Sequence, residues 1–203
     1  MASFELALVT ISSIIAVMEP FSTIAVYATI TKGYDSAKRD KIISRSMLLS
    51  LIVLVFFALT GHLLFNIFQI TIASFQIAGG ILLVAVALQM LDVGKPEDLE
   101  ERGKNVAIVP LAFPLTAGPG PITAVILLMS RSGGILDSVF VFVGILAGIA
   151  IIYVGMKYSS RLFKLLGDDG LRVVTALMAI IVLAIAVQFI IEGIADVIPQ
   201  ITG

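Results

Sequence analysis

Apolar residues form six long stretches along the chain, separated by short polar segments. Each stretch is close to the roughly 20 residues that a helix needs to cross a hydrocarbon core of about 30 Å. The alternating pattern of a membrane β-barrel is absent, so the sequence predicts six transmembrane helices. The predicted spans are Phe4–Ile30, Met47–Phe68, Ile72–Leu91, Val106–Ser130, Ile135–Met156 and Leu171–Ile198.

The composition also indicates a membrane protein. Of 203 residues, 59% are hydrophobic and 13% are charged, against about 45–50% and about 25% in soluble domains. The mean hydropathy is +1.12. The absence of cysteine excludes disulfides and thiolate metal sites, and the 13 Lys and Arg residues form no basic face for nucleic acid. We expect a multi-pass protein of the cell membrane that contacts lipid and has no nucleic-acid partner, metal or cofactor.

A polar segment divides the chain into two halves. Residues 92–105 include eight charged residues and are expected to form a cytoplasmic linker between residues 1–91 and residues 106–203, each with three predicted helices. Twelve of the 13 Lys and Arg residues follow the first, third and fifth spans, and only Arg131 falls on the opposite side. Because Lys and Arg are retained in the cytoplasm during insertion, both termini are predicted to lie outside.

The two halves show a weak internal repeat. A constant separation of 99 residues pairs Pro20 with Pro119 in the first span of each half, and Gln89 with Gln188 in the third. Units with an odd number of helices insert upside down relative to each other. The predicted fold is therefore an all-α membrane protein built from two inverted three-helix repeats.

Prolines predict that the first and fourth spans are broken. Proline removes a backbone donor and clashes with the preceding turn; Pro20 lies in the first span, and four prolines lie between Pro110 and Pro121. About 11 residues follow each break before Lys32 or Arg131, which is roughly 17 Å of helix. Both breaks are thus expected near mid-membrane, where non-helical backbone must be buried in protein or line a wet cavity.

The helix ends at these breaks suit a zwitterion. N-termini expected near Phe21 and Pro121 would offer N–H groups to a carboxylate, and carbonyls ending near Met18 and Phe113 would suit an ammonium group or a cation. The alternative for Gly79 and Gly80 is close helix packing, and the alternative for the Thr116–Gly120 segment is a structural kink. The candidate substrate-binding residues are Glu19, Pro20, Ser22, Thr23, Gly79, Gly80, Thr116, Gly118, Pro119, Gly120 and Thr123.

Glu19 is the one carboxylate predicted near the bilayer centre. Acids at that depth are costly and usually serve ions or protons. Glu19 is therefore a candidate for binding the substrate ammonium or for carrying a coupling proton; the structural alternative is a protonated Glu that hydrogen-bonds the broken backbone. No Ser/His/Asp grouping, HExxH motif or phosphate loop occurs in the sequence, so we do not expect an enzyme.

These motifs resemble the MarC family of membrane proteins, whose members include small neutral amino-acid transporters of the SnatA type. The most specific pieces are Phe113–Ile122, Ile77–Ile81 and Val187–Gly193, and a weaker one is Glu19–Ala25. In the family this last motif usually begins Asn-Pro, whereas here Glu19 precedes the proline. The resemblance implies a six-helix inverted-repeat transporter that carries glycine, alanine or similar amino acids at a central site.

The leading hypothesis is transport of a small neutral amino acid by alternating access, with H⁺ or Na⁺ as candidate coupling ions. An ion or small-solute channel and a membrane scaffold without transport are the alternatives. In the fifth span, the Gly144-x-x-x-Gly148 pattern is compatible with a homo-oligomer or with packing inside one chain.

Overall fold

The computed structural model describes residues 3–31, 33–91, 107–130 and 132–202. The predicted linker 92–105, Lys32 and Arg131 lie outside these residues. The described chain is all-α, as the sequence predicts. Its helices are α1 (Ser3–Val17), α2 (Pro20–Ile30), α3 (Ser36–Phe68), α4 (Ile72–Leu91), the π-helix η2 (Ala107–Thr116), α6 (Pro119–Ser130) and α7 (Ile135–Thr202).

Four helical stretches are long and apolar enough to cross a membrane. They are Glu5–Ala28, which combines α1 and α2, Ser36–Phe68, Ile135–Ser159 and Ala176–Ile198. Two shorter apolar helices, Ile72–Leu88 and Pro119–Ser130, complete the set. Each of the six predicted spans therefore corresponds to an apolar helical stretch in the structure.

Two helices extend beyond the predicted spans. The helix α3 begins at Ser36, where the Asp35 side chain accepts a hydrogen bond from the Lys38 backbone N–H at 2.7 Å, although the span was predicted to begin at Met47. The helix α7 continues through the expected connection between the fifth and sixth spans. Both differences have the same reason, because an apolar stretch marks the part of a helix in lipid and hydrogen bonding can continue beyond it.

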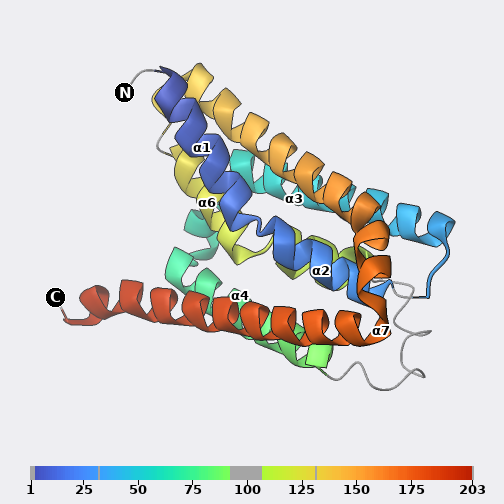
Figure 1. Cartoon of the computed structure of the whole chain (residues 1–203). Coiled ribbons are helices and arrows are strands. Elements are labelled where there is room, and N and C mark those ends of the chain that lie inside the picture. The colour runs from blue at the N-terminus through green and yellow to red at the C-terminus, as the bar shows by residue number, and fades with distance from the viewer. Residues whose placement is uncertain (1–2, 32, 92–106, 131, 203) are drawn as a thin grey trace.

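The helices are arranged around a shared interior (Figure 1). The first arm of α7 (Ile135–Ser159) and its second arm (Ala176–Ile198) run in opposite directions, and α7 packs against α1, α2 and α4. The two chain ends lie at the same end of the molecule. Both the α3–α4 and the α6–α7 turns also lie there, so the successive apolar stretches alternate in direction (Figure 1).

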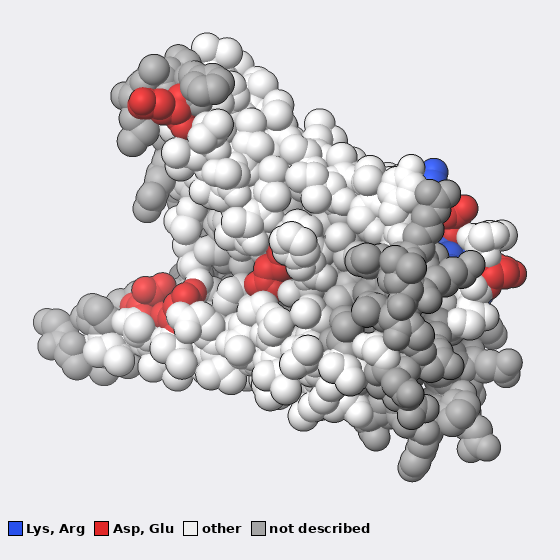
Figure 2. Space-filling model, viewed as in Figure 1, with Lys and Arg blue, Asp and Glu red and all other residues white. Residues whose placement is uncertain are grey.

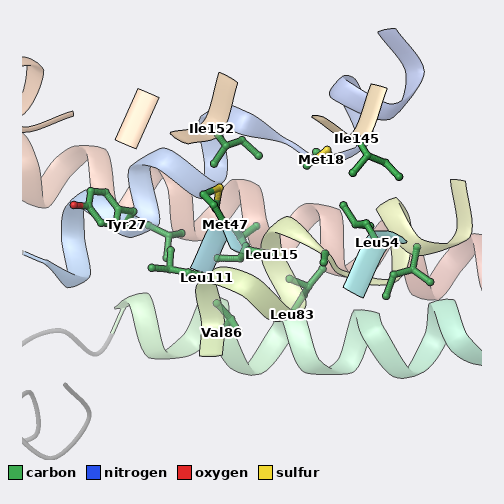
Figure 3. Close-up of a cluster of buried hydrophobic side chains, with 14 of the residues drawn as sticks. Met18, Tyr27, Met47, Leu54, Leu83, Val86, Leu111, Leu115, Ile145 and Ile152 are labelled. Atoms are coloured by element: carbon green, nitrogen blue, oxygen red, sulfur yellow. The ribbon is translucent and has the colours of Figure 1, made fainter. Parts of the chain in front are cut away.

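Large apolar side chains from several helices fill the interior. Tyr27, Leu54, Leu111 and Ile152 are fully buried. Figure 3 shows these four side chains in the interior between the helices, on α2, α3, η2 and α7 respectively. At one end of this core the Arg39 guanidinium donates to the Tyr27 hydroxyl at 3.3 Å and to the Ser159 hydroxyl at 3.4 Å. The same core thus holds α2, α3 and the first arm of α7 together.

The Gly144-x-x-x-Gly148 pattern packs inside the chain. A Cβ on Gly144 would meet Ile14 at 2.8 Å, and one on Gly148 would meet Met18. The two glycines therefore allow the first arm of α7 to approach α1 closely, which favours the intrachain reading of this pattern over an oligomer contact.

Candidate functional site

The first helix break lies between α1 and α2, as predicted. The Met18 N–H still donates to the Ile14 carbonyl at 3.0 Å, and the Thr23 N–H donates to the Glu19 carbonyl at 3.2 Å as the next helix begins. Glu19 itself has a φ of +47°, a left-handed conformation in which Asn is enriched. The backbone conformation at this position is therefore one that Asn adopts more readily than Glu.

The second break lies between η2 and α6. In η2 the helix is widened, and the Ala117 N–H donates to the Ala112 carbonyl at 2.9 Å, five residues earlier. The α6 helix then begins at Pro119, and the Ile122 N–H donates to the Gly118 carbonyl at 3.0 Å. A Cβ on Gly118 would collide with the Pro114 carbonyl oxygen, so this turn requires glycine.

The two breaks lie against each other. A Cβ on Gly120, in the first turn of α6, would come within 3.1 Å of Val17 at the end of α1. A Cβ on Gly79 would collide with Pro119, and one on Gly80 would meet the Ala186 carbonyl oxygen at 2.7 Å. Gly79, Pro119 and Gly120 are therefore brought together, and the glycines allow α4, α6 and the end of α1 to approach closely.

The first turns of α2 and α6 differ in their number of free backbone N–H donors. In α2, Pro20 has no N–H, and the N–H groups of Phe21 and Ser22 have no backbone partner among the described residues. In α6, both Pro119 and Pro121 lack an N–H, and only Gly120 keeps one, since Ile122 is bonded to Gly118. Most of the donors that could bind an anion therefore belong to α2.

Three buried polar side-chain atoms have no hydrogen-bond partner among the described residues. They are Thr23 Oγ1, Gln76 Oε1 and Thr123 Oγ1. Gln76 lies one turn before Gly79, and Thr123 lies one turn after Pro119, so these two flank the Gly79–Pro119 contact on facing helices. Buried polar atoms are almost always bonded, and water or a ligand can supply the partner that these three atoms lack among the described residues.

Gln76 was not among the predicted site residues. Its signal was present in the sequence, because an amide inside an apolar span, one turn from the Gly79-Gly80 pair, is unusual. The predicted residue Thr116 is buried, and its hydroxyl already donates to the Leu111 carbonyl at 2.8 Å. That hydroxyl stabilises η2 and keeps only its acceptor capacity for a ligand.

Glu19 lies on a different surface from most of the predicted site. It lines a groove of about 930 Å³ between the α1–α2 junction and both arms of α7, together with Pro20 and Ser22. Thr23, Gly79, Gly80, Thr116, Gly118, Pro119, Gly120 and Thr123 do not line this groove. Figure 2 shows a patch of acidic atoms in the middle of the view, near where α1 meets α2 in Figure 1, whereas the other acidic and basic atoms in this view lie toward its left and right edges.

Comparison with known proteins identifies relatives over nearly the whole chain. Residues 4–198 match the family described as MarC family integral membrane protein. A UPF0056 membrane protein of Methanocaldococcus jannaschii is 35% identical over 90% of this chain and 93% of its own. The UPF0056 membrane protein YvbG of Bacillus subtilis is 32% identical over 94% of this chain and 95% of its own.

A further relative, the UPF0056 membrane protein YhcE of Escherichia coli, is 31% identical over 91% of this chain and 89% of its own. No solved structure matches the chain. The relatives' names describe membrane proteins without naming a substrate. The family match spans both helix breaks and all the apolar stretches, and the chain therefore belongs to the MarC family of multi-pass integral membrane proteins.

Proposed function

We propose that this protein transports small neutral amino acids, of the glycine and alanine class, by alternating access between two inverted three-helix repeats. The observation that carries the proposal is the meeting of two broken helices beside buried polar atoms that have no hydrogen-bond partner in the described part of the chain. Discontinuous helices that meet inside a membrane protein typically form the substrate and ion site of a transporter.

The directions of the helices support the inverted repeat. The broken pairs α1–α2 and η2–α6 run in opposite directions, and so do α4 and the second arm of α7 (Figure 1). Contacts between these last two are reciprocal: Gly80 packs against Ala186 and Ile190, whereas Gly193 packs against Ala73 and Ile77. Corresponding helices of inverted repeats are expected to be antiparallel in this way.

The chemistry of the breaks favours a zwitterion of small size. Unbonded N–H groups of Phe21, Ser22 and Gly120 would bind the substrate carboxylate, because helix N-termini favour anions. The unpartnered oxygens of Thr23, Gln76 and Thr123 would accept hydrogen bonds from the ammonium group. Close packing around Gly79 and Pro119 would exclude a large substrate side chain.

Glu19 is the candidate for coupling transport to H⁺ or Na⁺. It lies beside the break but faces the groove rather than the Gly79–Pro119 contact. In the proposed topology the protein lies in the cell membrane with both termini outside, because that places 12 of the 13 Lys and Arg residues on the cytoplasmic side.

The test is uptake of labelled glycine and alanine by proteoliposomes that contain the purified protein. We expect saturable uptake that an imposed pH or sodium gradient drives. The matched variants are Gln76→Leu, which removes an unpartnered oxygen, and Gln69→Leu, which changes the same residue type at the exposed end of α3. Uptake that does not saturate would indicate a channel, and absence of uptake for every small amino acid tested would overturn the proposal.

A further inference from the structure

The groove that Glu19 lines is apolar apart from that carboxylate and Ser22. Among the residues that the structure describes, its lining contains no other ionisable side chain. Its walls come from three segments: the α1–α2 junction, the first arm of α7 with Ile151 and Val154, and the second arm with Met178 and Ile181. The Glu19 carboxylate forms no ion pair or hydrogen bond with any described residue.

The groove opens sideways to the surroundings of the protein. Phe21 on its rim is 86% exposed, and Val154 in its wall is 52% exposed. Glu19 lies well inside the apolar stretch Glu5–Ala28, so this opening faces lipid in an integral membrane protein. An unpaired carboxylate at that depth is costly, and a partner that reaches it from the lipid must itself be largely apolar.

We propose that this groove binds a hydrophobic organic cation, such as a quaternary ammonium or phosphonium ion with apolar substituents, which enters from the bilayer. The Glu19 carboxylate balances the positive charge. The exposed Phe21 ring supplies a face for a cation–π contact, and the flexible Met178 thioether adapts to irregular substituents. The volume of about 930 Å³ lies within the usual range for sites of drug-sized ligands.

This groove meets the proposed amino-acid site only at the α1–α2 junction. Apart from Pro20, Ser22 and Glu19 at the α1–α2 junction, none of the predicted substrate-binding residues lines the groove. A ligand there would contact both arms of α7 and the outer side of the first break. Binding can therefore be measured at equilibrium without an amino acid, and its result does not depend on whether transport occurs.

The experiment measures binding of tetraphenylphosphonium to the purified protein in lipid nanodiscs by equilibrium dialysis. We expect saturable binding of one cation per chain. Glu19→Gln should weaken binding at least tenfold, whereas Glu19→Asp, which keeps the charge, should retain it within a few fold. Val154→Phe and Ile181→Phe fill the groove without changing its charge and should also weaken binding.

Leu59→Phe is the matched control, because it enlarges an exposed apolar residue on α3, away from the groove. It should leave binding unchanged. Thermal unfolding of each variant establishes that it is folded. Equal binding by the wild type and a folded Glu19→Gln variant would overturn the proposal. The proposal would also be overturned if the wild type bound no cation and instead formed a dimer through this groove. Dissociation of that dimer by Val154→Phe would identify the groove as the dimer contact.

Discussion

Glu19 is held in a left-handed conformation immediately before Pro20, and its side chain faces the groove. For residues other than Gly, Asn and Asp this conformation costs about 1–2 kcal/mol. This conformational cost is consistent with a functional role for the Glu19 carboxylate, because strained backbone positions cluster at functional sites. The backbone and the charge of Glu19 can be tested separately, because different substitutions change them separately.

Replacing Glu19 by Asn should stabilise the protein relative to replacement by Gln. Both variants lose the charge, but only Asn suits the φ of +47°. We expect Glu19→Asn to be more stable than Glu19→Gln by about 1 kcal/mol, measured by denaturant unfolding in detergent. Equal stability of the two variants would show that the left-handed backbone carries no such cost.

The role of Glu19 in coupling is tested by transport. Glu19→Gln should abolish the response of glycine uptake to an imposed pH gradient, because Gln cannot carry a transported proton. Exchange of labelled for unlabelled glycine should persist, since exchange needs no net proton movement. If uptake by the variant responds to the pH gradient as uptake by the wild type does, Glu19 has a structural role only.

Replacing Thr123 should change protein stability and glycine binding in opposite directions. Its buried hydroxyl has no hydrogen-bond partner among the residues that the structure describes, so Thr123→Val should stabilise the substrate-free protein by about 1 kcal/mol. The same change should weaken glycine binding about tenfold, the equivalent of one hydrogen bond. Thr60→Val is the control, because the Thr60 hydroxyl bonds its own helix at 2.7 Å on α3. A stabilised Thr123→Val with unchanged glycine affinity would remove Thr123 from the site.

Among the secondary-structure elements, the turn between η2 and α6 is the most constrained. Gly118→Ala would place a methyl group against the Pro114 carbonyl oxygen and should destabilise the protein by about 1–3 kcal/mol. Gly134→Ala is the control, since nothing lies within 4 Å of the added atom. Thermal unfolding in detergent measures both variants. Equal tolerance of the two changes would show that the second break does not depend on the Gly118 turn.

Much of the element structure could be predicted from the sequence, because lipid imposes simple rules on it. Apolar length located the six stretches, and Pro20 and Pro119 located both breaks. The early start of α3 and the continuous α7 could not be predicted in this way, since apolar length does not mark where a helix ends outside lipid. The π-helical form of η2 could not be predicted either, because a proline shows where a helical hydrogen bond is lost but not which hydrogen-bond spacing replaces it.

The candidate site was only partly predictable for a related reason. Spacing placed Glu19 and Thr116 in the broken segments, but the directions of their side chains depend on packing between helices. In the structure Glu19 faces the groove and the Thr116 hydroxyl bonds the Leu111 carbonyl. Gln76 joins the site through the contact between Gly79 and Pro119, which links residues far apart in the sequence.

For the whole molecule, the two breaks meet where the halves of the chain pack against each other. Val17 and Gly79 from the first half meet Gly120 and Pro119 from the second. In the proposed transport cycle, a relative movement of the halves would open this contact to one face of the membrane and then to the other. Movement of that kind exposes one site alternately to the two faces of the membrane, which is the property that separates a carrier from a channel.

Glycine counterflow tests this central claim most directly. Proteoliposomes loaded with unlabelled glycine are diluted into a trace of labelled glycine, with no ion gradient imposed. The account predicts a transient, saturable accumulation of label above equilibrium that Gln76→Leu reduces and Gln69→Leu leaves unchanged. Accumulation that never exceeds equilibrium, in protein that is folded and inserted, would contradict alternating access at the meeting of the two helix breaks.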